Sequence, residues 1–225
     1  MPTVLITGAS RGIGLELTRQ FAADGWTVLA ACRDPDGASD LRAVSGDVTT
    51  FSVDVDSADS VTALKNAVGD RAVDVLLNNA GIIGSRGSFD DLDYDAWAGA
   101  MNTNVFGPMR VSQAFAGNVL ASDRKQMVFI SSKMASIAEC GGGAYVYRSS
   151  KTALNMAVKC LSVELGSKGV TAMMFHPGHV RTDMGGATAP VLPTESAAGM
   201  KGVIENLTTS DNGRFLNFDG TPLPW

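Results

Sequence analysis

The sequence lacks any long apolar run. No uninterrupted apolar segment approaches the roughly 20 residues that a membrane-spanning helix requires. The first apolar run covers only residues 4–6, whereas a secretory signal needs a longer apolar stretch preceded by basic residues. We therefore expect a soluble, cytoplasmic protein with no membrane partner.

Clusters of positive charge are missing as well. The chain has 18 Lys and Arg residues against 23 Asp and Glu residues, a formal net charge of −5, and its cations form no run. A surface that binds a nucleic-acid duplex needs clustered cations to displace counterions from the phosphates. The composition therefore disfavours nucleic acid as a partner.

Cysteine and histidine are scarce. Cys32, Cys140 and Cys160 are scattered and form no CxxC pair, so we expect free thiols in a reducing compartment. His176 and His179 have no cluster of acidic or thiol residues beside them, and the Pro-Gly pair between them predicts a turn. Metal is therefore not expected.

What the chain does have is an alternation of short β-branched runs and longer helical patterns. The patterns predict strands at 3–7, 27–32, 50–53, 73–78, 126–131, 171–175 and 214–217, and helices at 13–23, 58–68, 95–120, 144–166 and 194–206. Strands joined by helix-length connections form a parallel sheet with helices on both faces. The strands are also apolar on both sides, as a doubly covered sheet requires. The sequence predicts an α/β fold with a doubly wound parallel sheet of about seven strands.

Nothing divides the chain into separate domains. It contains no repeat, no low-complexity stretch and no shift in composition typical of a linker. The loosest segment is 185–193, whose small residues and prolines exclude regular structure. Because only about thirty residues follow it, we interpret it as a mobile loop within one domain, residues 1–225.

A glycine-rich loop lies between the first predicted strand and the first predicted helix. Gly8 allows a tight turn, Gly12 lets the backbone approach a pyrophosphate, and Gly14 lets the helix pack closely on the sheet. The N-terminus of the helix then offers free N–H groups and the positive end of its dipole to a phosphate. In this position, the loop predicts dinucleotide binding.

The same loop contains a competing pattern. Residues 8–12 match the G-x-S-x-G nucleophile elbow of hydrolases, with Ser10 as nucleophile and His176 and His179 downstream as bases. That elbow needs an earlier strand-to-helix loop for half of its oxyanion hole, but Ser10 follows the first strand. A hydrolase is therefore disfavoured.

Tyr147 and Lys151 form a candidate proton-donating pair. Carbonyl reduction needs a proton for the oxygen, and a tyrosine can supply it if its pKa falls from about 10 towards neutrality. A lysine four residues later lies on the same helix face, and its positive charge favours the phenolate. Neither Tyr94 nor Tyr145 has a lysine at this spacing. The polar strand end at 131–132 and the glycine run at 141–143 support the pair, because they let substrate approach the hydroxyl.

Taken in order, the motifs resemble the short-chain dehydrogenase/reductase family along nearly the whole chain. T-G-x-x-x-G-x-G at 7–14 is followed by N-N-A-G at 78–81, N-V-F-G at 104–107, S-S at 131–132, Y-R-S-S-K at 147–151 and P-G-H-V-R-T at 177–182. The resemblance implies a single-domain Rossmann fold, a nicotinamide cofactor, and hydride transfer between nicotinamide and a carbonyl or alcohol carbon.

The resemblance also implies roles for individual residues. The implied catalytic residues are Asn104, Ser132, Tyr147 and Lys151, with Tyr147 as general acid/base. The implied cofactor-binding residues are Gly8, Ser10, Arg11, Gly12, Ile13, Gly14, Arg33, Asp54, Val55, Asn79, Ala80, Gly81, Tyr147, Lys151, Pro177, Gly178, Val180 and Thr182. Among them, Asp54 and Val55 are expected to flank the adenine, and Thr182 to contact the carboxamide. Taken alone, Asp54 is better interpreted as a helix cap and Asn79 as a turn former.

Two of these roles have an alternative nearby. Ser132 fits the serine that bonds the substrate oxygen, although its interval to Tyr147 is fifteen residues rather than the family's usual thirteen. The extra length falls in 137–143, and Ser131 remains the alternative. Asn104 fits the asparagine that holds a proton-relay water better than Asn102 does.

The residues after the second strand bear on the choice of cofactor. Arg33 pairs well with a 2′-phosphate, and Arg11 can approach the same group. Asp34 lies at the usual offset of a ribose-binding acid, but its sequence context, R-D-P-D-G, is typical of a turn. We expect NADP(H) to be preferred over NAD(H).

Within the family, the chain resembles the carbonyl reductases and the related C-factor signalling proteins. The resemblance rests on S-S-K-M at 131–134, Tyr147-Arg148 and the ending D-G-T-P-L-P-W at 219–225. It implies a reductase of ketones, aldehydes or quinones; the alternative is a nucleotide-binding signalling or regulatory protein with incidental catalysis. Relatives often pair through their long helices, here 95–120 and 144–166, which suggests a homodimer or homotetramer, whereas some carbonyl reductases are monomers.

Overall fold

A single parallel sheet organises the molecule. The computed structural model describes residues 1–225. Its strands are β1 (Thr3–Thr7), β2 (Thr27–Cys32), β3 (Val48–Ser52), β4 (Val75–Asn78), β5 (Gln126–Ile130), β6 (Thr171–His176) and β7 (Phe215–Asn217). All six pairings are parallel, in the order β3-β2-β1-β4-β5-β6-β7. The predicted seven-stranded α/β fold is confirmed.

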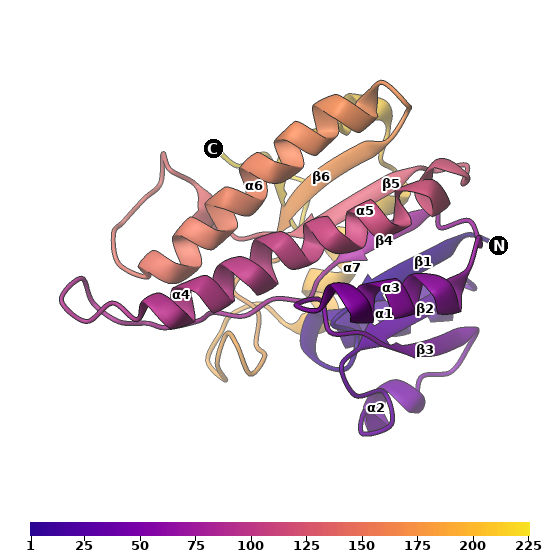
Figure 1. Ribbon diagram of the computed structural model, residues 1–225, viewed down its shortest axis with the longest axis horizontal. Coiled ribbons are helices and arrows are strands. Elements are labelled where there is room, and N and C mark those ends of the chain that lie inside the picture. The colour runs from indigo at the N-terminus through magenta and orange to yellow at the C-terminus, as the bar shows by residue number, and fades with distance from the viewer.

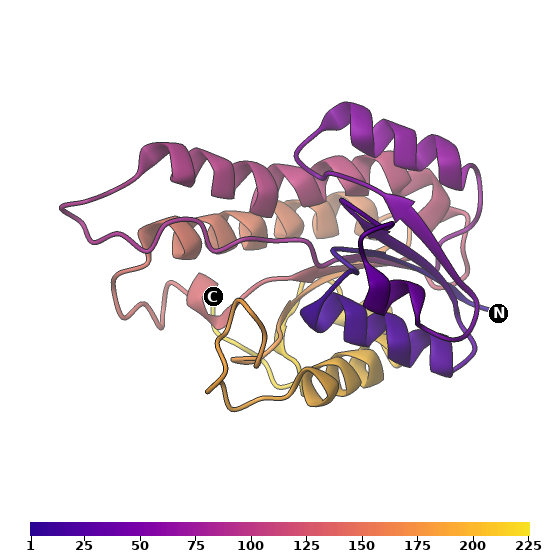
Figure 2. The same ribbon diagram turned by 90° about the horizontal axis from the view of Figure 1, so that it is seen from below.

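Helices cover both faces of this sheet. One face carries α3 (Ala58–Val68), α4 (Tyr94–Met101), α5 (Gly107–Leu120) and α6 (Tyr145–Gly166), while the other carries α1 (Gly12–Ala23) and α7 (Pro193–Glu205) (Figures 1 and 2). A short helix, α2 (Ser39–Arg42), lies beyond β2. Each face buries its own apolar cluster, of 24 and 22 residues, which explains why the strands are apolar on both sides.

The prediction of one continuous helix over 95–120 is wrong. The chain forms α4, then a π-helical segment at Asn102–Phe106, then α5. Pro108 has no N–H, so it cannot donate the α-helical hydrogen bond that the Asn104 carbonyl would accept. π-helical turns are rare, occur mostly as single turns inside α-helices, and are frequent at functional sites.

Other predicted boundaries differ by one or two residues, most clearly at the edge of the sheet. The strand predicted at 50–53 runs from Val48 to Ser52, and its residues are only partly buried. An edge strand carries a weaker apolar pattern than β1, whose residues are all buried and whose predicted bounds are confirmed. Residues 185–192 form no helix, although Val191 forms an isolated β-bridge with Val180, and Pro193 is already the first residue of α7.

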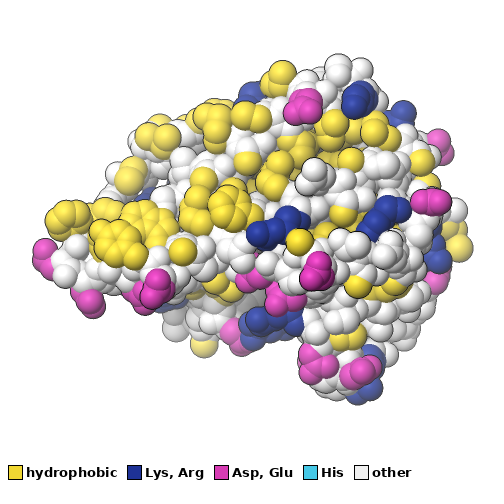
Figure 3. All heavy atoms as spheres, viewed as in Figure 1, with side chains coloured by type: hydrophobic (Ala, Val, Ile, Leu, Met, Phe, Trp, Pro, Cys, Tyr) yellow, Lys and Arg dark blue, Asp and Glu magenta, His cyan; other side chains and the backbone are white.

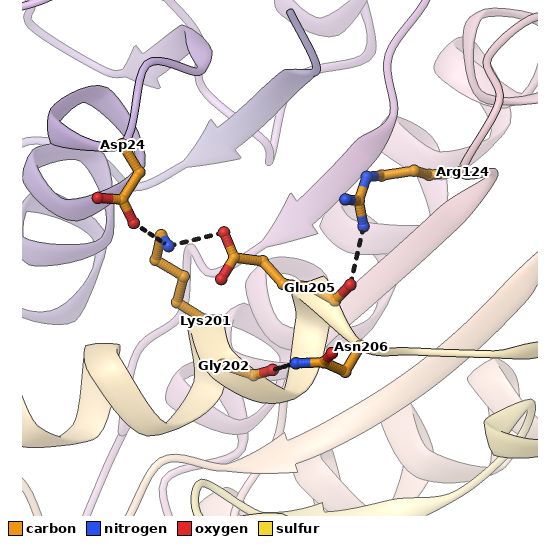
Figure 4. Close-up of polar contacts among 6 residues, drawn as sticks. All are labelled: Asp24, Arg124, Lys201, Gly202, Glu205 and Asn206. Atoms are coloured by element: carbon orange, nitrogen blue, oxygen red, sulfur yellow. Dashed lines mark hydrogen bonds and ion pairs between the residues drawn. The ribbon is translucent and has the colours of Figure 1, made fainter.

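A buried cation joins α1 to α7 on the second face. The Lys201 ammonium forms ion pairs with Asp24, beside the end of α1, and with Glu205, at 2.7 Å (Figure 4). Burial lowers the pKa of Lys201, but hydrogen bonds to the two carboxylates outweigh this and raise the pKa above its ordinary value. Arg124 donates to the Glu205 carbonyl at 3.1 Å, which ties the end of α7 to the turn before β5.

Candidate active site

The glycine-rich loop and Asn79 form one closely packed unit at the carboxyl edge of the sheet. Gly8 and Gly12 have φ values of +68° and +55°, which favour glycine. A Cβ on Gly14 would lie 2.3 Å from the Gly8 carbonyl oxygen and 2.5 Å from Asn79 Nδ2. Asn79 donates from Nδ2 to the carbonyls of Thr7 (2.9 Å) and Gly8 (3.1 Å). Asn79 therefore holds the loop instead of simply forming a turn.

The N-terminus of α1 faces this loop without a protein partner. Arg11 is the N-cap residue and makes no side-chain capping bond, and the first turn holds no acidic residue. Ser10 lies in the loop before it, and Ile13 packs on the apolar cluster beneath. Free N–H groups and the dipole at a helix N-terminus favour an anion such as phosphate.

Two exposed arginines lie near the β1–β2 side of the sheet edge. Arg33 directly follows β2 and is exposed. Arg11 makes an ion pair with Asp183 at 3.4 Å, but the side chains are 74% and 82% exposed, so the pair is worth little. Asp34 accepts a hydrogen bond from the Gly37 N–H at 2.9 Å, which agrees with its interpretation as a turn residue.

Asp54 and Val55 follow β3 at the same edge. Asp54 Oδ1 accepts from the Asp56 N–H at 3.0 Å, while Ser57 caps α3, so Asp54 is not the helix cap. Val55 is buried, and a Cβ on Gly107 would lie 2.9 Å from its Cγ2. Gly107 thus lets the start of α5 approach the loop after β3.

Tyr147 and Lys151 lie on one face of α6, directed at the sheet edge. The Lys151 ammonium is 5.9 Å from the centre of the Tyr147 ring and donates to the Ile130 carbonyl at 2.8 Å. Burial lowers the pKa of Lys151 to about 8. Burial raises the pKa of Tyr147, and a hydrogen bond with the Ser132 hydroxyl offsets part of this rise. In this state the phenol is therefore protonated at neutral pH.

The two neighbouring serines make different contacts. Ser132 is the N-cap of a short 3₁₀ turn, Lys133–Ala135, and its hydroxyl faces the Tyr147 phenol. Ser131 points instead to α6, where its hydroxyl donates to Asn155 Oδ1 at 2.6 Å in buried surroundings. The geometry thus favours Ser132 over Ser131 as the partner of Tyr147.

The two asparagines of the π-helical segment also differ. Asn104 is fully buried; its Nδ2 donates to the Ile82 carbonyl (2.8 Å) and Ser150 Oγ (3.0 Å), and its Oδ1 accepts from the Ile82 N–H (2.9 Å). Asn102 accepts a bond from Arg110 at 2.8 Å. A Cβ on Gly81 would lie 3.1 Å from Asn104 Oδ1 and 3.3 Å from Lys151 Nζ, so Asn104 and Lys151 meet at Gly81.

The loop after β6 crosses above the glycine-rich loop. Pro177 accepts a bond from Ser196 at 2.6 Å, Gly178 has a φ of +87°, and Val180 is buried beside Val191. A Cβ on Gly12 would lie 3.2 Å from Thr182 Cγ2. Thr182 therefore lies directly over the glycine-rich loop, at the edge where Ala80 also donates to Thr7 Oγ1.

The two histidines take separate roles here. Burial, together with the positive charge of Lys133 and His179, lowers the pKa of His176 to about 4. His179 Nε2 bonds the Gly185 carbonyl at 2.8 Å.

No group of three or more His, Cys, Asp or Glu side chains is placed to hold a metal ion. None of the helices is long and apolar enough to cross a membrane.

Sequence reasoning missed the polar residues that support this site. Ser150 links Asn104 to the Tyr147 carbonyl, and Asn155 partners Ser131. Thr152 bonds the Ala135 carbonyl at 2.9 Å, and Arg148 bonds the Met134 carbonyl at 3.3 Å. The available signal was that Ser150 and Asn155 are polar residues on the apolar face of a helix.

Comparison with known proteins agrees with this arrangement. The C-signal protein of Myxococcus xanthus is 41% identical over 154 residues, which cover 68% of this chain and 93% of that relative. The 1-hydroxy-2-glutathionyl-2-methyl-3-butene dehydrogenase of Rhodococcus sp. (strain AD45) is 35% identical over the full length of both proteins. The crystal structure of an NADPH-bound carbonyl reductase from chicken fatty liver matches with a TM-score of 0.94 and 32% identity, covering 100% of this chain and 99% of the other.

The family model agrees with these individual matches. The model described as short chain dehydrogenase matches residues 2–191. The chain therefore belongs to the short-chain dehydrogenase family of oxidoreductases.

Proposed function

We propose that the protein is an NADP(H)-dependent reductase that moves hydride between nicotinamide and a carbonyl or alcohol carbon. The observation that carries the proposal is the convergence of Ser132, Tyr147 and Lys151 at the carboxyl edge of the sheet, beside the glycine-rich loop. Ligands of open parallel sheets bind at this edge.

The residues present fit a dinucleotide. The space around Gly8, Gly12 and Gly14 is too narrow for side chains, and it opens on the uncapped N-terminus of α1. Gly8, Gly12 and the first N–H groups of α1 would hold the pyrophosphate, with Asn79, Ala80 and Gly81 towards the ribose and nicotinamide. Asp54 and Val55 would flank the adenine, while Pro177, Gly178, Val180 and Thr182 would cover the nicotinamide end. When bound, the cofactor supplies the hydride.

The chain's own groups would manage the proton. The Tyr147 hydroxyl donates it to the substrate oxygen, and the Ser132 hydroxyl binds the same oxygen and orients it. The Lys151 charge stabilises the phenolate that remains. The Asn104 carbonyl, which Pro108 leaves without an α-helical donor, would accept a bond from a water that returns the proton.

The preference for NADP(H) rests on positive charge at the adenosine end. Arg33 is exposed and forms no ion pair, and the weak Arg11–Asp183 pair exchanges readily for a phosphate. Asp34, which would favour NAD(H), is occupied by the Gly37 N–H. The chicken relative has NADPH bound, which agrees with this preference.

Deuteride transfer tests the proposed function. The protein is incubated with [4,4-²H₂]NADPH, in which both transferable hydrogens are deuterium, and a panel of ketones, aldehydes and quinones, and the products are analysed by mass spectrometry and NMR. We expect deuterium at the former carbonyl carbon of at least one alcohol product. Tight NADPH binding without deuterium transfer to any member of the panel would contradict the proposal.

The sequence identity of 41% with the C-signal protein supports a second candidate function. In that case the protein is a signalling or regulatory protein whose catalysis is incidental. The two functions differ in their dependence on the phenol. A biological effect that survives Tyr147→Phe, with NADPH binding intact, would support the signalling role, whereas loss of that effect would support the enzyme.

We further propose that copies of the chain pair through the apolar surface of α4 and α6. Hydrophobic side chains gather over these helices on one face of the molecule (Figure 3). Tyr94, Tyr145, Met156 and Val163 of these helices are exposed large apolar residues. Exposed apolar surface of this kind marks interaction sites. Light scattering should give at least a dimer mass for the wild type, and a monomer mass for Met156→Asp combined with Val163→Asp.

A further inference from the structure

The segment after β7 folds back along that strand. The Asn217 N–H donates to the Thr221 carbonyl at 2.8 Å, and the Leu223 N–H donates to the Phe215 carbonyl at 2.9 Å. Leu216 and Pro222 form an antiparallel bridge across the turn. Residues 221–225, hereafter the return segment, therefore run antiparallel to β7.

The return segment ends against the loop that carries Ser132. The Trp225 carbonyl accepts bonds from the Ala138 N–H (2.9 Å) and the Ser136 hydroxyl (3.3 Å). Figure 2 shows this end of the chain beside the short helical turn after β5. Ser136 also accepts a bond from the Glu139 N–H at 3.1 Å. One carbonyl thus ties together residues four and six positions after Ser132.

The Trp225 side chain keeps that carbonyl in place. Its ring lies 6.0 Å from the Phe215 ring, centre to centre, and 6.0 Å from the Lys159 ammonium of α6. Aromatic and cation–π contacts of this geometry are stabilising. The indole is 46% exposed, so it serves as a surface anchor between β7 and α6 more than as core filling.

The loop has no comparable anchor on this side. Its other tethers lead to α6: Thr152 bonds Ala135, and Arg148 bonds Met134 and Gly142. Beyond Ala138 lies the run Gly141-Gly142-Gly143, in which Gly142 and Gly143 have φ values of +79° and +62°. As glycines, these residues have no side chains that could anchor the loop. Without Trp225, the stretch from Ser136 to Glu139 would keep only bonds within the loop itself, such as that from the Glu139 N–H to the Ser136 hydroxyl, and the exposed ion pair between Lys133 and Glu139.

We propose that Trp225 is a positioning residue for Ser132. It holds the loop from Ser132 to Glu139 so that the serine hydroxyl stays at the Tyr147 phenol, and it thereby sets turnover on the substrate side without contributing to dinucleotide affinity. This inference rests on the proposed function, because it assumes that Ser132 orients the substrate oxygen.

Hydrogen exchange and kinetics of Trp225→Ala test the inference. Amide exchange should become faster at 136–140 and stay unchanged in the glycine-rich loop. The value of kcat/KM should fall about 10- to 100-fold, as expected for misplacement of a reacting group by up to about 1 Å. The Kd for NADPH should stay within about twofold. Trp225→Phe keeps an aromatic ring and should recover most of the rate; Ile137→Ala, an exposed position in the same loop, should leave both readouts near wild type.

A double-mutant cycle connects the effect to the serine. In a Ser132→Ala background, Trp225→Ala should cost little further activity, because coupled residues are not additive. Fully multiplicative losses, or unchanged exchange at 136–140, would overturn the inference. Full activity in Ser132→Ala alone would instead contradict the proposed function, while the exchange experiment reports on the tether independently of any activity.

Discussion

The two halves of the candidate site are built by different means. On the nucleotide side, around β1, β2 and α1, the site consists of backbone groups, space reserved by glycines, and exposed arginines. On the proton-transfer side, between β5 and α6, it consists of buried side chains bonded to main-chain atoms, such as Lys151 to Ile130 and Asn104 to Ile82. The first half is a narrow glycine-lined loop with positive charge beside it. The second half holds individual side-chain atoms in fixed positions.

This difference follows from the chemistry each half would perform. A dinucleotide carries many hydrogen-bonding groups, so an open cradle of N–H groups can bind it with little help from any one side chain. Proton transfer depends on the distance between two atoms and on their pKa values, which requires side chains locked by packing. Substitutions on the nucleotide side should therefore change affinity, and those on the other side should change turnover.

The largest of the expected effects on the nucleotide side comes from Gly14→Ala. The added Cβ meets the Gly8 carbonyl at 2.3 Å and Asn79 Nδ2 at 2.5 Å, so the loop must shift. Overpacking of this kind costs about 1–3 kcal/mol, which corresponds to a roughly 5- to 150-fold higher Kd for NADPH. Calorimetric titration measures it. Gly117→Ala, a helical glycine with open space around its Cβ, is the matched control; equal losses in both variants would contradict the account.

Arg33→Ser should lower the ratio of NADPH to NADH affinity by about tenfold. The substitution removes a charge-assisted bond to the 2′-phosphate, worth about 1.5 kcal/mol at an exposed position. The Kd values for both cofactors, measured by fluorescence titration, give the ratio. NADH affinity should be unchanged, and a parallel loss for both cofactors would indicate that Arg33 contacts something other than the 2′-phosphate.

On the proton-transfer side, titration of Lys151 should change the rate of reduction with pH. Lys151 has a pKa of about 8, so its positive charge is present below this pH and lost above it. Because that charge stabilises the Tyr147 phenolate, kcat/KM for reduction should be level below pH 8 and fall by up to about tenfold per unit above it. Lys151→Met should abolish this fall in kcat/KM above pH 8. An unchanged fall in that variant would show that another group with a pKa near 8 causes it.

How much of this the sequence predicts depends on whether a feature is local. β1 and α3 are predicted to the residue, because a run of buried apolar residues or a complete amphipathic pattern is visible in one short window. The interruption of α4–α5 was missed, although Pro108 marks it locally; the same proline also fits the first turn of a new helix, where it lies in α5.

Contacts between distant segments could not be predicted. The choice between Ser131 and Ser132 depends on Asn155, twenty-four residues beyond Ser131, which takes the first hydroxyl and leaves the second for Tyr147. Likewise, the sequence shows that the ending at 219–225 is distinctive, but only the structure shows Trp225 against the loop after Ser132. The motifs indicate which residues act, and the supporting residues come from the fold.

The most direct test of the central claim is single-turnover hydride transfer in Tyr147→Phe. The variant keeps the aromatic ring and removes only the hydroxyl that is proposed to donate the proton. The account predicts a rate about 10²- to 10⁴-fold lower than that of the wild type, with the Kd for NADPH nearly unchanged. A rate within a few-fold of wild type at saturating NADPH would show that the proton comes from another group, and the assignment of Tyr147 as the acid would be wrong.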